Sequence, residues 1–290
     1  MDHIYPEYCP STRLVPLTPA ETVDKQRLRH NFGRQAGRYD QHAVVQRRLA
    51  QELVATLQAL RQPFGHILEI GCGTGYLTWL LRQAFPAARL TALDLAPAAL
   101  QAAQARLAGA EDIHWLVADG EQEVPGVFDL MVSSSVFQWF GQPAQACRRY
   151  FQHLTAGGVL AFATLGPRTF QELASSFASA GQRLPELAIP AIPAQHFVTG
   201  PAWCDYLEAA GFQEVHLRQE QWREFHPDLW AFLKAVRGMG ATSTRPRFLS
   251  RRLLAAMAEE YHRRYQAPQG LPVTYEVLWL QGRKPLAKET

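Results

Sequence analysis

The chain has 290 residues, of which 47% are hydrophobic and 19% charged, enough apolar surface for a large core, so general disorder is excluded. The length fits one large α/β domain with insertions or two smaller units. The net charge of +3 is too small to indicate a nucleic-acid partner.

The sequence does not indicate a membrane span, a signal peptide or a metal site. No run approaches the ~18 consecutive apolar residues of a membrane span, and the first residues lack the basic and apolar segments of a signal peptide. We therefore expect a cytoplasmic protein without a membrane partner. The four cysteines are widely spaced and no H-E-x-x-H motif occurs, so neither a disulfide scaffold nor a metal site is expected.

The first 60 residues divide into an arm and a helical segment. Four prolines in residues 1–22 disfavour a helix and predict an irregular arm. In residues 24–60 apolar side chains recur at helical spacing with a break near Gly37, which predicts two helices. We expect these helices to belong to one domain that spans residues 23–290.

Short apolar runs and helical patterns then alternate along the chain. This alternation indicates βαβ units and a parallel sheet wound right-handedly. Two further strands follow, the second near the end of the chain, so that seven strands are expected in an α/β fold. The expected strands are 66–70, 89–94, 113–119, 128–134, 158–164, 213–220 and 273–281.

Two longer stretches interrupt this pattern. Residues 167–199 hold a helical segment and three prolines, and a helix expected at 202–210 ends at Gly211. Residues 221–272 carry helical patterns between the last two expected strands. The sequence therefore predicts two helical insertions in the domain.

The first strand runs directly into a glycine-rich loop, and a helix follows. Gly71, Gly73 and Gly75 permit positive φ angles and close approach of a ligand to the backbone at a helix N-terminus. The strand–loop–helix context therefore predicts a nucleotide-like ligand, whereas a G-x-G alone would also fit a plain turn.

Acidic residues stand at three successive strand ends. Asp94 closes the second strand about 20 residues after the loop, where a carboxylate can accept hydrogen bonds from both ribose hydroxyls. Asp119 ends the third strand, in place to meet an adenine amino group, and Glu69 precedes the loop. A helix N-cap or a solvated carboxylate would explain one acid but not the set. An NAD-dependent dehydrogenase is the alternative, although Tyr76 stands where its third loop glycine belongs.

The loop and the three acids are similar to those of class I S-adenosylmethionine-dependent methyltransferases. Five segments extend this similarity: N-F-G-R-Q-A-G-R-Y-D-Q-H-A-V-V-Q, L-E-I-G-C-G-T-G-Y-L-T, V-F-Q-W-F, L-T-A-G-G-V-L-A-F-A-T-L and F-L-K-A-V-R-G-M-G-A-T. Together they resemble one family among these enzymes, the malonyl-acyl-carrier-protein O-methyltransferases of biotin synthesis. Some of the segments are shared in part with trans-aconitate and quinone-pathway methyltransferases.

The resemblance implies a Rossmann-like, seven-stranded mixed sheet with an antiparallel last strand, N-terminal helices and an inserted helical lid over the ligand crevice. It implies S-adenosylmethionine as the cofactor, with Glu69 near the methionine amino group and Asp94 on the ribose. Ser134 departs from the asparagine common in the family. The expected cofactor-binding residues are Glu69, Gly71, Cys72, Gly73, Thr74, Gly75, Asp94, Leu95, Asp119, Gly120 and Ser134.

The resemblance also implies methylation of the free carboxyl of malonyl-acyl carrier protein, or of malonyl-CoA, as the start of pimeloyl synthesis for biotin. A carboxyl with an ordinary pKa of about 4.3 is ionised at neutral pH, so no catalytic base is assigned. Aromatic rings favour a methyl-sulfonium cation, and Phe137, Trp139 and Phe140 are candidate pocket walls, although aromatic clusters also pack in cores. Tyr39, Gln138 and Trp139 are the expected positioning residues, and Tyr39 also matches a family position that caps the cofactor site.

A basic stretch within the second insertion is a candidate dock for an acidic acyl carrier protein. Residues 245–264 hold six arginines and two glutamates, a net charge of +4, and one arginine could pair with the malonyl carboxylate. A solvated basic helix is the alternative. The arginines expected to bind substrate or carrier protein are Arg245, Arg247, Arg251 and Arg252.

Other acceptors and classes of function stay open at this point. A free dicarboxylic acid such as trans-aconitate, or a quinone precursor, is the alternative acceptor, and a quinone precursor would make His42 or His196 candidate bases. A cofactor-binding module without turnover is the non-enzyme alternative. No RNA-binding module supports a nucleic-acid substrate.

Overall fold

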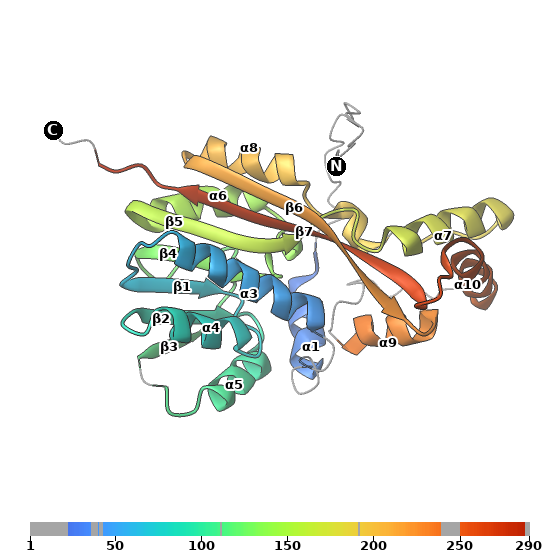
Figure 1. The fold of residues 1–290 in the computed structure, drawn as a ribbon, viewed down its shortest axis with the longest axis horizontal. Coiled ribbons are helices and arrows are strands. Elements are labelled where there is room, and N and C mark those ends of the chain that lie inside the picture. The colour runs from blue at the N-terminus through green and yellow to red at the C-terminus, as the bar shows by residue number, and fades with distance from the viewer. Residues whose placement is uncertain are drawn as a thin grey trace.

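The computed structural model describes residues 23–35, 40, 43–110, 112–190, 192–238 and 250–287, so the expected arm at 1–22 lies outside the described residues. Seven strands form one sheet in the order β3-β2-β1-β4-β5-β7-β6, with β7 antiparallel to both of its neighbours (Figure 1). This confirms the expected mixed sheet. The strands are β1 His66–Ile70, β2 Arg89–Asp94, β3 Ile113–Val117, β4 Phe128–Ser134, β5 Leu154–Leu165, β6 Gln213–His226 and β7 Leu271–Arg283.

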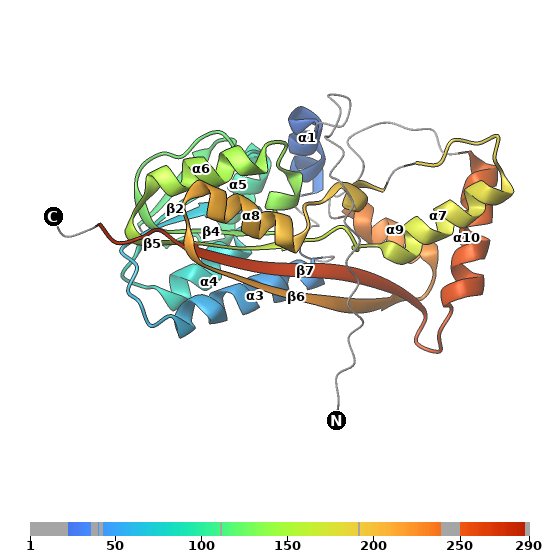
Figure 2. The same ribbon diagram turned by 90° about the horizontal axis from the view of Figure 1, so that it is seen from above.

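Helices cover both faces of this sheet. Figure 2 shows α3 and α4 below the sheet and α6 and α8 above it. The described helices are α1 Lys25–Gln35, α3 Val44–Ala59, α4 Tyr76–Ala84, α5 Pro97–Arg106, α6 Pro143–His153, α7 Gln171–Arg183, α8 Gly200–Ala210, α9 Leu229–Gly238 and α10 Arg251–Tyr265, with short 3₁₀ turns η2 Phe137–Trp139 and η3 Pro193–His196.

The central strands are apolar on both faces because each face meets a helical layer. On β4, Leu130 and Val132 pack into one cluster with Leu53 of α3. Met131 points the other way and packs with Tyr150 of α6 and other residues of the second cluster. Alternation of side chains along the strand therefore builds two cores from one apolar run.

The last two strands extend further than the sequence indicated. β6 was expected to end at residue 220, but it pairs with β7 as far as His226, which lies opposite Leu271. Trp222 on this extension is 8% exposed, and its ring centroid lies 5.2 Å from that of Trp279. The strand pairing therefore buries a contact between two aromatic rings, which the mostly polar sequence of the extension does not indicate. The second connection is therefore 227–270, and α7, α9 and α10 surround the extended ends (Figures 1 and 2). Within the described residues, no helix is long and apolar enough to cross a membrane.

Candidate active site

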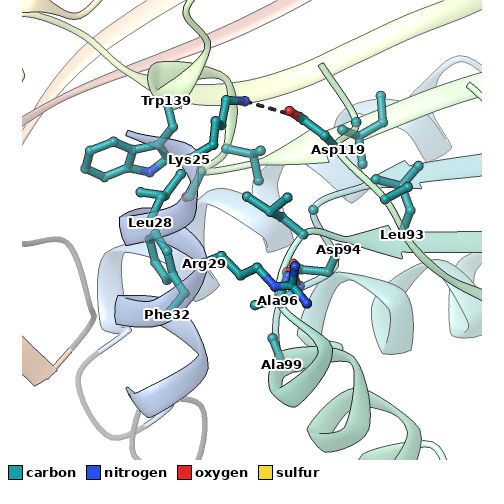
Figure 3. Close-up of a pocket in the computed structure, with 18 of the residues that line it drawn as sticks. Lys25, Leu28, Arg29, Phe32, Leu93, Asp94, Ala96, Ala99, Asp119 and Trp139 are labelled. Carbon is teal, nitrogen blue, oxygen red and sulfur yellow. Dashed lines mark hydrogen bonds and ion pairs between the residues drawn. The ribbon is translucent and has the colours of Figure 1, made fainter. Parts of the chain in front are cut away.

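A cavity lies where the carboxyl ends of the parallel strands face α1, and we call it the first cavity (Figure 3). It occupies the crevice in which open α/β sheets bind ligands. Its described walls come from α1 and from the loops after β1 to β4. They include Lys25, Leu28, Arg29, Phe32, Gly71, Gly73, Thr74, Asp94, Leu95, Asp119, Gly120, Ser134, Ser135, Trp139 and Phe140.

The glycine loop forms one wall of the first cavity. Gly71 and Gly73 have φ angles of 73° and 53°, which favour glycine. A Cβ atom on Gly71 would lie 2.4 Å from Val136, whereas one on Gly73 would meet no atom within 4 Å. Gly73 thus turns bare backbone toward open space. Gly75 does not line the cavity, because it packs α4 against Ala103 of α5.

Asp94 connects the glycine loop to the next helix. Its Oδ2 accepts a hydrogen bond of 2.8 Å from the Gly73 amide, and its Oδ1 accepts one of 2.8 Å from the Ala96 amide. Burial raises the pKa of Asp94, and the two amides lower it. Each carboxylate oxygen keeps a further lone pair, so the side chain is fixed in place and can still accept hydrogen bonds from a diol.

Glu69 is a buried acid beneath the loop. It is 1% exposed, and neither carboxylate oxygen has a hydrogen-bond partner among the described residues. Burial, with a smaller contribution from Asp94, raises the pKa of Glu69 to about 8, and nearby Thr78 offsets only part of that rise. An unpartnered buried carboxyl is costly unless a ligand satisfies it.

Asp119 takes part in an ion-pair cluster with α1. It lies two residues past the end of β3, and its Oδ1 is 3.2 Å from the Lys25 Nζ, which is also 2.6 Å from Glu121 (Figure 3). The Lys25 ammonium lies 5.2 Å from the centroid of the Phe140 ring. Asp119 therefore lines the cavity as expected, but its carboxylate also holds α1 in position.

Asp40 contributes a second link that sequence reasoning missed. It accepts a 2.8 Å hydrogen bond from the Thr74 hydroxyl and forms an ion pair with Arg106 of α5. Cys72, another expected cofactor residue, is buried against Ala92 and does not line the cavity. Thr74 thus joins the loop to the N-terminal segment, and Cys72 contributes packing.

The wall formed by α1 was also missed. Leu28 and Phe32 point into the first cavity, and Arg29 extends from α1 toward the end of β2, where Asp94 lies (Figure 3). The spacing of Leu28 and Phe32 indicates a buried helical face, but the sequence does not say which part of the fold that face covers.

The described residues fit a nucleoside sulfonium such as S-adenosylmethionine. Gly73 leaves room for close approach, and Asp94 is held ready for a diol. Glu69 has an unpartnered carboxyl that suits an ammonium group, but it is buried and does not line the cavity. The Ser134 hydroxyl in the cavity wall also has no partner among the described residues. These side chains therefore offer hydrogen-bonding groups for the ribose diol and for the amino-acid end of such a ligand.

A second cavity adjoins the first. The two share Phe32, Ser135 and Trp139, and the ring centroids of Phe32 and Trp139 are 6.1 Å apart. The first insertion supplies part of the second cavity, as the expected lid would. The other described lining residues are Gln46, Gln138, Leu165, Thr169, Phe170, Pro193, Ala194, Phe197 and Tyr275.

Known proteins resemble this chain along almost its whole length. A family model described as a methyltransferase domain matches residues 68–160. The malonyl-acyl-carrier-protein O-methyltransferase of Anoxybacillus flavithermus is 37% identical over 262 residues, covering 89% of this chain and 97% of that protein. The chain belongs to the malonyl-acyl-carrier-protein O-methyltransferase family.

A second relative agrees with this assignment, and a solved structure has a similar fold. The malonyl-acyl-carrier-protein O-methyltransferase of Geobacter sulfurreducens is 34% identical, covering 90% of this chain and all of that protein. The plantazolicin methyltransferase BpumL, solved with SAH, has a TM-score of 0.50 and 16% identity, covering 90% of this chain and 97% of that one. The family thus accounts for the expected Rossmann-like fold, and the dehydrogenase alternative is wrong.

Not all of the residues expected to bind the acceptor line a cavity. Trp139 lines both cavities and Gln138 lines the second. Phe137 lines neither, because it is 1% exposed and stacks in the core with Phe140 and Tyr150. The phenyl ring thus supports the cavity wall from behind.

The expected residues on the N-terminal segment and the second insertion are only partly described. Tyr39, His42, Arg245 and Arg247 lie outside the described residues. Exposed His196 lines neither cavity.

Arg251 and Arg252 begin α10, which packs on α7 (Figures 1 and 2). Arg252 is 2.9 Å from Glu186 in an ion pair. No described residue of 227–270 lines either cavity.

Proposed function

We propose that this chain transfers the methyl group of S-adenosylmethionine to the free carboxyl of malonyl-acyl carrier protein, the start of pimeloyl synthesis for biotin. The observation that carries the proposal is the 37% identity to a malonyl-acyl-carrier-protein O-methyltransferase over 97% of that relative. The expected cytoplasmic location stays a prediction.

Residues of the first cavity, together with the buried Glu69, would prepare the donor. Bound S-adenosylmethionine supplies a methyl group on a sulfonium, and transfer to a carboxylate oxygen breaks the carbon–sulfur bond as the carbon–oxygen bond forms. Asp94 would hold the ribose and Glu69 the methionine ammonium. The aromatic wall of Phe32 and Trp139 would exclude water where the two cavities meet, and its rings favour a nearby cation.

The chain needs to align the acceptor but not to deprotonate it. A carboxyl with an ordinary pKa of about 4.3 is ionised at neutral pH, so positioning is the main contribution expected of the protein. Gln138 fits a positioning role through Ser135, because its Oε1 accepts a 2.8 Å hydrogen bond from Thr164 and its Nε2 donates one of 2.8 Å to the Ser135 carbonyl.

A panel of acceptors tests the proposed function. Labelled S-adenosylmethionine is incubated with the protein and, separately, malonyl-acyl carrier protein, malonyl-CoA, trans-aconitate and quinone precursors. We expect the malonyl carrier protein to be labelled with the highest kcat/KM. Preferred labelling of trans-aconitate or of a quinone precursor would replace the proposed acceptor.

The pH dependence of transfer distinguishes a carboxylate acceptor from a quinone-type one. With cofactor saturating, single-turnover transfer to the malonyl acceptor is expected to change by less than about twofold between pH 6 and 8, because no group has to lose a proton. Rapid-quench measurements give this rate. A tenfold rise per pH unit would indicate an obligatory base and contradict the carboxylate mechanism.

Charge reversal on α10 tests the proposed carrier-protein dock. Arg251→Glu with Arg252→Glu is expected to raise the KM for malonyl carrier protein several-fold more than that for malonyl-CoA, and the effect should shrink between about 50 and 300 mM salt. Arg252 also loses its exposed ion pair with Glu186, which is worth at most about 1 kcal/mol.

A matched control reverses Arg61 and Arg89, which are exposed before β1 and at the start of β2, at the amino ends of these parallel strands. Equal effects of the two double variants would reject a dock on α10.

A further inference from the structure

We propose that the second cavity is the acceptor site and that Gln46 and Ser135 bind the malonyl end of the acceptor, an assignment that rests on the proposed function. The position of the cavity is the first argument. Because the two cavities share Phe32, Ser135 and Trp139, a donor in the first and an acceptor in the second would meet at one wall. In-line transfer requires this arrangement of reacting groups.

Two polar atoms in the second cavity are unsatisfied. Gln46 Oε1 and Ser135 Oγ are shielded from solvent, and neither has a hydrogen-bond partner among the described residues. Buried polar groups are costly without partners, and such exceptions call for an explanation. A substrate carboxylate or carbonyl bound between them would accept a hydrogen bond from the Ser135 hydroxyl, and one from Gln46 once the carboxamide is turned so that its NH₂ takes the place of Oε1.

Other polar side chains of the same cavity are already engaged, which separates them from this pair. Both ends of the Gln138 carboxamide form hydrogen bonds with protein atoms. The Thr169 hydroxyl accepts a hydrogen bond from the Glu276 amide and donates one to the Glu276 carbonyl. Gln46 and Ser135 therefore stand out as groups available to a ligand.

The backbone of Ser135 is held in an unfavourable conformation. Its φ angle is 62°, although it is not glycine. Its amide donates a 2.8 Å hydrogen bond to the Ala163 carbonyl, and its own carbonyl accepts one from Gln138. Strained residues held by such contacts occur at functional sites. The contacts fix the hydroxyl in the wall that the two cavities share.

The chemistry of the two side chains matches a malonyl group. A carboxylate and a thioester carbonyl are both hydrogen-bond acceptors, the Ser135 hydroxyl can donate, and the Gln46 carboxamide can turn its NH₂ toward a ligand. Hydrogen bonds to an ionised acceptor are stronger than those to a neutral one. Methylation removes the negative charge of the carboxylate, so the same contacts would weaken and favour product release.

Two substitutions test the assignment with malonyl-CoA as the acceptor. Gln46→Met keeps the side-chain length and removes the carboxamide, and Ser135→Ala removes the hydroxyl. Each is expected to raise the KM for malonyl-CoA or lower kcat/KM about tenfold or more. For Gln46→Met, the Kd for S-adenosylmethionine measured by calorimetry should stay within about twofold of that of the unmodified protein. The reason is that Gln46 lines the second cavity but not the first.

Gln51→Met is the matched control. Gln51 is exposed on the same helix, and its Nε2 donates a 2.8 Å hydrogen bond to the Tyr76 hydroxyl. The substitution should leave both constants unchanged. Gln46→Glu keeps the proposal testable if Gln46→Met does not fold, since a negative charge there should repel the carboxylate and reduce kcat/KM further. Normal acceptor kinetics in the Gln46 variants, or equal loss of cofactor binding, would overturn the assignment.

Failure of the proposed function gives a different result. If the unmodified protein does not methylate malonyl-CoA or malonyl carrier protein, the acceptor identity is wrong whatever the variants do. The Gln46 variants are then measured with the acceptor that the panel identifies. A selective loss of kcat/KM for that acceptor would retain the second cavity as the acceptor site, and no loss would reject it.

Discussion

Replacing Asp94 with alanine is expected to weaken S-adenosylmethionine binding by about 2–4 kcal/mol, because two charge-assisted hydrogen bonds to the ribose are lost. Because Asp94 also accepts hydrogen bonds from the Gly73 and Ala96 amides, the substitution should in addition lower the free energy of unfolding by about 1–3 kcal/mol. Calorimetry and denaturant unfolding measure the two effects separately.

Asp129→Ala is the control for this substitution. Asp129 accepts hydrogen bonds from the Gly65 and His66 amides at the amino end of β1, so it has the same kind of bonds far from the cavity. It should lower the free energy of unfolding by a similar amount without changing cofactor affinity. If Asp94→Ala binds S-adenosylmethionine as tightly as Asp129→Ala does, Asp94 does not bind the ribose.

Glu69→Gln is expected to remove a large pH dependence of stability. The pKa of Glu69 is raised from 4.5 to about 8 in the folded protein, so the folded state binds the proton more tightly than the unfolded state. Its contribution to stability is complete below pH 4.5 and is lost as the pH rises through about 8, at up to ~1.4 kcal/mol per pH unit. In the absence of cofactor, the difference in unfolding free energy between the unmodified protein and Glu69→Gln should follow this course.

Cofactor binding should reverse the ionisation of Glu69. A methionine ammonium beside the carboxyl favours its charged form, so binding near pH 7 should release about one proton more from the unmodified protein than from Glu69→Gln. Calorimetry in two buffers of different ionisation enthalpy measures that difference. Equal proton release from the two proteins would place the ammonium elsewhere.

The sheet was predictable because its signals are local. Apolar runs located β1, β2 and β4 with the bounds that the structure gives. The extension of β6 was not predictable, because its six added residues are mostly polar and depend on pairing with β7 and on the contact between Trp222 and Trp279. Long-range pairing of this kind leaves little trace in a single strand.

Some residues of the candidate site were also predictable from local sequence signals, and others were not. The glycine loop, Asp94 and the acids were accessible because their chemistry and spacing are contained in one βαβ segment. Lys25, Asp40 and Gln46 were not, because these residues reach the cavities or the glycine loop only through the packing of the N-terminal segment. Phe137 shows the converse limit, since its spacing fits a pocket wall while its ring packs in the core.

Intact-mass measurement of malonyl-acyl carrier protein after incubation with the enzyme and S-adenosylmethionine tests the central claim most directly. We predict that the carrier gains the mass of one methylene unit and that mild base, which hydrolyses a methyl ester, releases methanol. Unchanged carrier mass under conditions in which trans-aconitate or a quinone precursor is methylated would contradict the claim.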